Sequence, residues 1–304
     1  MPENWPNFFV AGAPKSGTTS LYHYLNQHPE IFMSSVKEPH YFADEVRPCY
    51  FGEELRRFSV RGEFPRLVQT ESQYLNLFAD AGGSAAVGEA SVCYLWSASA
   101  PRNIANVVPA ARIILVLRNP VERAFAQHRK LMHIHPVPLS FAAHIELGLS
   151  AHGPELNPAH PFLELGNYHR QMLRYLEYFP SEQIQVHLYD DYRADPAGML
   201  RRIFAFLRVD PDYQPDLSTR HMTGGVPRSL KLHDIAVRKL RLGYRLKKIL
   251  PDSAHSTLKK LIYRPGKSAL IDPRDRARLV DYYRNDVLAL SDLLKRDLSH
   301  WLQA

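Results

Sequence analysis

The sequence predicts a single α/β domain in which a central, mainly parallel sheet is flanked by helices. Two observations predict this class. Residues 112–118 form a continuous apolar run between two arginines, which is typical of a parallel strand buried on both faces. The runs 8–11 and 183–189 also have strand character, and a segment of helical spacing follows each of the three runs. We find no repeat, low-complexity tract or linker, so we expect one domain over residues 1–304.

The composition narrows the class of protein. Hydrophobic residues make up 45% of the chain and charged residues 23%, which is ordinary for a soluble globular protein. The sequence has no apolar run long enough to span a membrane and no signal-peptide pattern, so we expect a cytoplasmic location. Two cysteines, Cys49 and Cys93, form no disulfide framework. No carboxylate or cysteine completes a ligand set with His128, His133 and His135, so we expect no metal.

The most informative stretch is residues 8–20, where an apolar run leads through a small-residue turn into a helix start at Thr18. Such a turn binds phosphates because free N–H groups and the positive end of the helix dipole point at the anion. Gly17 allows close backbone approach, and Lys15 adds a positive charge. This is not the ATP-binding loop in which lysine follows the last glycine, since Lys15 precedes Gly17. We expect six residues to contact the anion: Lys15, Ser16, Gly17, Thr18, Thr19 and Ser20.

A second polar segment follows at residues 37–42, after an expected short strand at 30–33. Lys37, Glu38 and His40 place an ammonium group, a carboxylate and an imidazole within four residues. A carboxylate or imidazole near an anion site can serve as a general base. Without further context, a surface loop of common polar residues is the simpler interpretation.

Arg118 ends the run at 112–118, and Pro120 suits the first turn of a following helix. Ligands of open α/β sheets bind at the carboxyl ends of the strands. We therefore expect Arg118 to face a ligand. Further helices are expected at 71–79, 140–149, from 166 to 179, at 195–207, 234–250 and 272–297.

Three segments, in this order, resemble motifs of the PAPS-dependent sulfotransferases of the carbohydrate and heparan-sulfate type (PAPS is 3′-phosphoadenosine 5′-phosphosulfate). They are Pro-Lys-Ser-Gly-Thr-Thr at 14–19, Lys-Glu-Pro-His-Tyr-Phe at 37–42 and Arg-Asn-Pro-Val-Glu-Arg at 118–123. The resemblance extends over residues 7–301.

The resemblance implies a P-loop-like phosphosulfate-binding loop and in-line transfer of a sulfuryl group from PAPS to a hydroxyl or amine, leaving the bisphosphate PAP. Lys15 would stabilise the leaving phosphate and Glu38 would act as base, with His40 as a supporting or substitute base. Arg118 would bind the 3′-phosphate. No metal would be required, and the acceptor would be a carbohydrate or glycoconjugate.

Residues 87–95 and Tyr168 resemble parts of the family that lie on the acceptor side. Glu89, Ser91, Tyr94 and Tyr168 are therefore candidate substrate contacts. A structural carboxylate is an equally good interpretation of Glu89, and packing at a helix start is at least as good for Tyr168.

The chain departs from the family pattern at three positions. Ala126 replaces the serine of the 3′-phosphate motif, Val92 stands where proline is usual, and Ala90 where heparan-type enzymes often carry lysine.

The segment 228–267 is strongly basic, with twelve lysines and arginines against two aspartates. A glycine-rich loop precedes it, and the resemblance makes Arg228 and Ser229 further cofactor contacts; a flexible linker is the alternative. The basic segment fits best a lid over the site, then a polyanion-binding surface, then peripheral contact with an anionic membrane.

Two other functions compete with sulfuryl transfer. A nucleotide kinase or NTPase would use the same loop, although its lysine is misplaced and no acidic partner strand is evident. A non-catalytic polyanion-binding protein would use the segment 228–267. We expect no nucleic-acid partner.

Overall fold

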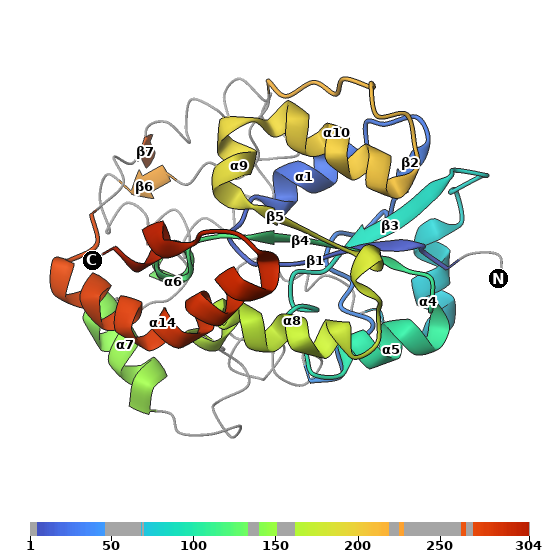
Figure 1. Cartoon of the computed structure of the whole chain (residues 1–304). Helices are drawn as coiled ribbons and strands as arrows, with labels where there is room; N and C mark the ends of the chain where they lie inside the picture. Colours follow the sequence, from blue (N-terminus) through green and yellow to red (C-terminus); the bar gives the residue numbers. More distant parts are fainter. Residues whose placement is uncertain are drawn as a thin grey trace, which may run out of the picture.

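A parallel sheet of five strands forms the centre of the fold (Figure 1). The computed structural model describes residues 5–45, 68, 70–132, 140–150, 162–218, 225–227, 263–265 and 270–303. The strand order is β2-β3-β1-β4-β5, and every pair of neighbours is parallel. The strands are β1 (Phe8–Gly12), β2 (Ile31–Met33), β3 (Ala86–Ala90), β4 (Arg112–Leu117) and β5 (Ile184–Leu188). The predicted α/β class with a parallel sheet is confirmed.

The central strands are buried on both faces, as the apolar run predicted. Side chains alternate between the faces along a strand, and two separate hydrophobic clusters result. Val10 and Ile114 belong to one cluster, whereas Phe9 and Ile113 belong to the other. All four side chains are fully buried.

Helices cover both faces of the sheet (Figure 1). One face carries α1 (Thr18–Leu25), α9 (Tyr189–Ala194) and α10 (Pro196–Leu207). The other carries α4 (Glu71–Leu75), α5 (Ala100–Val107), α6 (Pro120–Met132), α7 (Phe141–Ser150), α8 (Tyr168–Leu176) and α14 (Pro273–Leu294). Single 3-10 turns complete these layers: η1 (Asn76–Phe78), η2 (Glu164–Gly166), η3 (Ser181–Gln183) and η5 (Ser299–Leu302).

The helices largely match the sequence pattern, with one addition. The expected helices at 195–207 and 272–297 are α10 and α14. The expected strand at 183–189 and helix at 195–207 leave residues 190–194 between them, and these residues lie within the additional helix α9. The expected helix 234–250 lies outside the described residues. Two short strands, β6 (Gly225–Pro227) and β7 (Tyr263–Pro265), pair in antiparallel fashion. Within the described ranges, we find no helix of the length and apolarity needed to cross a membrane.

The topology brings distant segments to one edge of the sheet. Strand β1 lies between β3 and β4, so β2 and β3 lie on one side of β1 and β4 and β5 on the other. The order in which strands are added to the sheet therefore changes direction at β1. Such a change of direction is where parallel α/β sheets bind ligands. Lys15 follows β1, Glu38 follows β2 and Arg118 follows β4, and this edge therefore holds all three predicted motifs.

Candidate active site

The turn between β1 and α1, residues 13–17 and here called the Lys15 loop, has a constrained backbone. Lys15 has φ 70° and Gly17 has φ 82°, both in the left-handed region. A Cβ on Gly17 would lie 2.6 Å from Cε1 of Tyr192, so neither the backbone angle nor the space admits another residue. Ser16 is fully buried, and its Oγ has no hydrogen-bond partner among the described residues. An unpaired buried hydroxyl beside a helix N-terminus is a group that a bound phosphate would satisfy.

Lys15 lies in an unusually positive environment. Burial, reinforced by repulsion from Lys130 and Arg123, lowers the pKa of Lys15 to about 7, while Glu38 acts in the opposite direction. A cation held among other cations gains the most when an anion arrives. The Lys15 loop therefore has both the donors and the charge of a phosphate site.

Glu38 lies in a tight polar group at the end of β2. Its carboxylate accepts a hydrogen bond from Nζ of Lys37 at 2.5 Å and lies 3.8 Å from Nε2 of His40. Burial tends to raise the pKa of Glu38, but the charge and hydrogen bond of Lys37 and the charge of Lys130 hold it below its usual value, with a further contribution from His40 when the imidazole is protonated. The carboxylate is thus ionised at neutral pH and able to accept a proton.

The backbone of this segment is held in an unfavourable conformation. Glu38 has φ 62° and His40 has φ 58°, values that residues with a Cβ rarely adopt. Two hydrogen bonds to the neighbouring chain hold them: Glu38 N donates to the carbonyl of Ala90 at 3.0 Å, and His40 N donates to Oγ of Ser91 at 3.1 Å. Such strain, sustained by surrounding contacts, is characteristic of functional sites.

His40 is buried, and burial lowers its pKa below the usual range. Its Nδ1 lies 2.9 Å from Sγ of Cys93, and burial raises the pKa of that thiol well above its usual value. At neutral pH both groups are therefore uncharged. The contact orients the imidazole so that Nε2 faces Glu38.

The predicted acceptor-side residues of the β3 segment lie in the interior. Oε1 of Glu89 accepts hydrogen bonds from the hydroxyls of Tyr74 at 2.9 Å and Tyr94 at 2.6 Å, and Oε2 accepts one from Ser91 at 2.7 Å. All four side chains are fully buried. This geometry fits a structural carboxylate and not direct contact of Glu89, Ser91 or Tyr94 with an acceptor. We call these residues the Glu89 cluster.

Arg118 connects the end of β4 with the Lys15 loop. Its guanidinium donates to the carbonyl of Lys15 at 3.0 Å, lies 4.0 Å from the carboxylate of Glu122 and packs 4.9 Å from the ring centre of Tyr189. The side chain is only partly buried, so part of the guanidinium fork remains open to a ligand. The structure thus brings Arg118 and the Lys15 loop together.

Tyr168 is fully buried behind Arg118 at the start of α8. Burial raises its pKa to about 12, although the charges of Arg123 and Arg118 oppose this. Its ring packs edge-on against Trp301 at 6.4 Å. The position fits packing at a helix start, the alternative interpretation of this residue.

Two cations of α6 were not predicted as site residues. Arg123 is fully buried, and its guanidinium donates to the side-chain oxygen of Gln127 and to the carbonyl of Phe162, neither of which carries a charge. Lys130 acts electrostatically on both Lys15 and Glu38: it lowers the pKa of each. Arg123, Ala126 and Lys130 are spaced three and four residues apart, so they share one face of the helix. That spacing was the available signal, but nothing in it indicated which face meets Lys15.

Some predicted site residues are not described. Arg228, Ser229 and most of the basic segment 228–267 lie outside the described residues. In the part of the chain that is described, no group of three or more His, Cys, Asp or Glu side chains is placed to hold a metal ion.

Comparison with known proteins agrees with this geometry. A family model described as "Sulfotransferase family" matches residues 6–214. The chain is 27% identical over 298 residues to the bifunctional heparan sulfate N-deacetylase/N-sulfotransferase 2 of Mus musculus, covering 96% of this chain and 30% of that protein. It is 25% identical to human carbohydrate sulfotransferase 15 over 256 residues, or 68% of this chain and 44% of that one. The chain thus spans less than half the length of these two relatives.

A solved structure matches nearly the whole chain. The crystal structure of a sulfotransferase from Alicyclobacillus acidocaldarius superposes with a TM-score of 0.71 at 29% identity, covering 98% of this chain and 99% of that one. The family model covers well over half of the sequence, and the site residues 15–20, 38 and 118 lie inside the matched range. The chain belongs to the sulfotransferase family.

Proposed function

We propose that this protein transfers the sulfuryl group of PAPS to a hydroxyl or amine of a carbohydrate or glycoconjugate. The observation that carries the proposal is the contact of Arg118 with the backbone of Lys15 at 3.0 Å. It joins a guanidinium fork to a phosphate-type loop, which suits a ligand carrying phosphates at two ends. The unpaired hydroxyl of Ser16 and the lowered pKa of Lys15 also favour an anionic ligand.

The residues divide the work of the reaction. In the proposed step, the acceptor oxygen or nitrogen attacks sulfur in line, the bond from sulfur to the 5′-phosphate oxygen breaks, and PAP leaves. Transfer of this kind passes through a loose transition state by analogy with phosphoryl transfer, so positioning and charge stabilisation dominate. Lys15, the hydroxyls of Thr18 and Thr19 and the loop N–H groups would stabilise the charge on the leaving oxygen. Glu38 would take the acceptor proton.

His40 is better suited to support than to act as the base. The imidazole is buried, its Nδ1 is occupied by Cys93, and its Nε2 faces Glu38. We infer that it orients the carboxylate of Glu38.

A carbohydrate acceptor is supported by the names of the relatives, which include a heparan sulfate N-sulfotransferase and a carbohydrate sulfotransferase. The basic segment 228–267 would suit a polyanionic polysaccharide.

Sulfate transfer from ³⁵S-labelled PAPS to a panel of polysaccharides, some with free amino groups, tests the proposal. Glu38→Gln is expected to lower turnover by about a hundredfold or more, because it removes the proton acceptor. PAP affinity should stay unchanged in that variant. Glu71→Gln, which alters an exposed carboxylate of α4, is the matched control.

Two outcomes would favour the competing functions. A melting temperature that rises with Mg-ATP and not with PAP would support a nucleotide kinase or NTPase, since a ligand that binds the folded state raises it. Steeply salt-dependent binding of sulfated polymers, without transfer and unaffected by Lys15→Ala, would support a polyanion-binding protein.

A further inference from the structure

Helix α9 forms a wall shared by both halves of the proposed PAPS site. The ring of Tyr189 lies 4.9 Å from the Arg118 guanidinium. The rings of Tyr189 and Tyr192 also lie against Gly17, 3.2 Å and 2.6 Å from where its Cβ would be. Any movement of α9 would therefore change the surroundings of Arg118 and of the Lys15 loop together.

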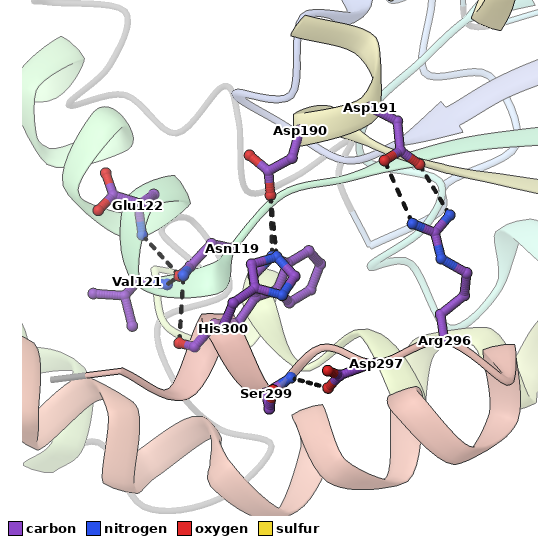
Figure 2. Close-up of polar contacts among 10 residues, drawn as sticks. Asn119, Val121, Glu122, Asp190, Asp191, Arg296, Asp297, Ser299 and His300 are labelled. Carbon is purple, nitrogen blue, oxygen red and sulfur yellow. Dashed lines mark hydrogen bonds and ion pairs between the residues drawn. The ribbon is translucent and has the colours of Figure 1, made fainter. Parts of the chain in front are cut away.

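The end of the chain holds α9 through its two acidic residues. Arg296 donates two hydrogen bonds to Asp191, at 2.9 and 3.4 Å. Oδ2 of Asp190 accepts from the indole Nε1 of Trp301 at 3.2 Å and lies 3.6 Å from Nε2 of His300 (Figure 2). We call Arg296, His300 and Trp301 the C-terminal clasp.

Trp301 also contacts Asn119, the residue that follows Arg118. Its carbonyl accepts a hydrogen bond from Nδ2 of Asn119 at 3.3 Å. The Oδ1 of Asn119 in turn accepts from the N–H groups of Val121 and Glu122 and so caps α6 (Figure 2). Leu117 pairs with Leu188 in the sheet, so Arg118 and Tyr189 directly follow neighbouring strands. The buried residue Trp301 therefore connects the two segments that follow β4 and β5, through Asn119 and Asp190.

We propose that the C-terminal clasp positions Arg118 for the 3′-phosphate, by fixing α9 against its guanidinium and Asn119 beside it. Trp301 and Arg296 are then positioning residues that never contact the nucleotide. This inference rests on the proposed PAPS site and adds to it a determinant of 3′-phosphate preference, located more than 170 residues along the chain from Arg118.

Binding of two ligands that differ only in the 3′-phosphate tests the inference. The ligands are PAP and adenosine 5′-monophosphate, titrated calorimetrically into the full chain. Trp301→Phe removes the indole N–H and keeps a ring, and Arg296→Met removes an exposed ion pair without altering the core. Each is expected to weaken PAP binding by about fivefold and to leave the affinity for the monophosphate within about twofold. Arg284→Met is the matched control, because it removes an ion pair within α14 that does not reach α9.

A double-mutant cycle separates positioning from general stabilisation. In an Arg118→Ala background, Trp301→Phe should cause no further loss of PAP affinity, because the group that it positions is gone. Equal weakening of both ligands, or an unchanged PAP preference in both clasp variants, would overturn the inference. If the unaltered protein shows no preference for PAP over the monophosphate, the proposed function fails, and this inference fails with it.

Discussion

Two buried polar groups lie at the same edge of the sheet, and they differ in whether their polar atoms are paired. In the Glu89 cluster, the carboxylate accepts three hydroxyl hydrogen bonds. Around the Lys15 loop, Ser16 Oγ and Arg123 Nε have no partner among the described residues, and the pKa of Lys15 is lowered to about 7. Buried polar atoms are normally paired, so unpaired donors beside a positively charged loop indicate a place for an anionic ligand. The comparison separates a structural carboxylate from a binding site.

The largest expected effect follows from removing the positive charge of Lys15, in the loop whose neighbouring polar atoms are unpaired. Lys15→Met should lower turnover by about a hundredfold or more, because charge on the leaving oxygen loses its main partner. It should not lower the free energy of unfolding, since a cation held among other cations is itself unfavourable. Steady-state kinetics and urea unfolding of the same preparation measure both. Loss of stability without loss of turnover would reverse the distinction between the two groups.

The paired group should behave in the opposite way. Glu89→Ala leaves the hydroxyls of Tyr74, Ser91 and Tyr94 without their acceptor, so we expect a loss of about 2 to 3 kcal/mol in the free energy of unfolding. Glu89→Gln keeps one acceptor oxygen and the side-chain volume, and it should lose less. Urea denaturation at a fixed pH provides the measurement. An alanine variant as stable as the original would show that the cluster does not support the fold.

The pH dependence of the free energy of unfolding is a second test of the role of Glu89 in stability. Burial raises the pKa of Glu89 to about 7, although the hydrogen bonds from Tyr94, Ser91 and Tyr74 oppose this. The folded state therefore binds a proton more tightly than the unfolded chain, whose carboxyl has the ordinary value of 4.5. The resulting stabilisation is complete below about pH 4.5 and is lost as the pH rises through about 7. In Glu89→Gln, the free energy of unfolding should no longer show this decline between about pH 4.5 and 7. If the decline were unchanged in the variant, other titratable groups would be its cause.

Glu38 and Glu89 also show how much of the candidate site can be predicted from the sequence. The sheet was predictable because the run 112–118 is apolar on both faces, and the motifs at 14–19, 37–42 and 118–123 located Lys15, Glu38 and Arg118. The sequence left two interpretations of Glu89 open, a contact with the acceptor and a structural carboxylate, because each is compatible with a carboxylate near a strand end. Burial separates them, and burial depends on Tyr74 and Tyr94, which come from other segments.

Contacts between distant segments were beyond any local pattern. Periodicity in the sequence predicts the type of secondary structure around a residue, but it does not predict the tertiary contacts of Lys130, Tyr189 and Trp301. The bonds of Trp301 to Asn119 and Asp190 depend on how the chain after α14 returns to the sheet.

The affinity for PAP should depend on pH through the titration of Lys15. Free Lys15 titrates near pH 7, and a bound phosphate would favour its charged form, so PAP binding above this pH takes up a proton. The affinity should then fall by up to about tenfold per pH unit between pH 8 and 9, where the phosphates of PAP, with pKa values near 6, no longer titrate. Calorimetry in two buffers of different ionisation enthalpy measures the proton uptake. Lys15→Met should show neither effect, and absence of proton uptake in the unaltered protein would mean that Lys15 is already charged when free.

The smallest expected effect lies where the two groups meet. The Oγ of Ser91 donates to Glu89 and accepts from the backbone N–H of His40, so the paired group holds the strained segment that carries Glu38. Ser91→Ala should lower turnover by about fivefold, the value of one hydrogen bond, and leave PAP affinity unchanged because the Lys15 loop is not involved. Ser97→Ala, at another buried serine, controls for loss of a hydroxyl. Suppose instead that Ser91→Ala weakened PAP binding as strongly as it lowered turnover. The Glu89 cluster and the Lys15 loop would then be coupled, and hydrogen-bond pairing would not distinguish a structural group from a binding site.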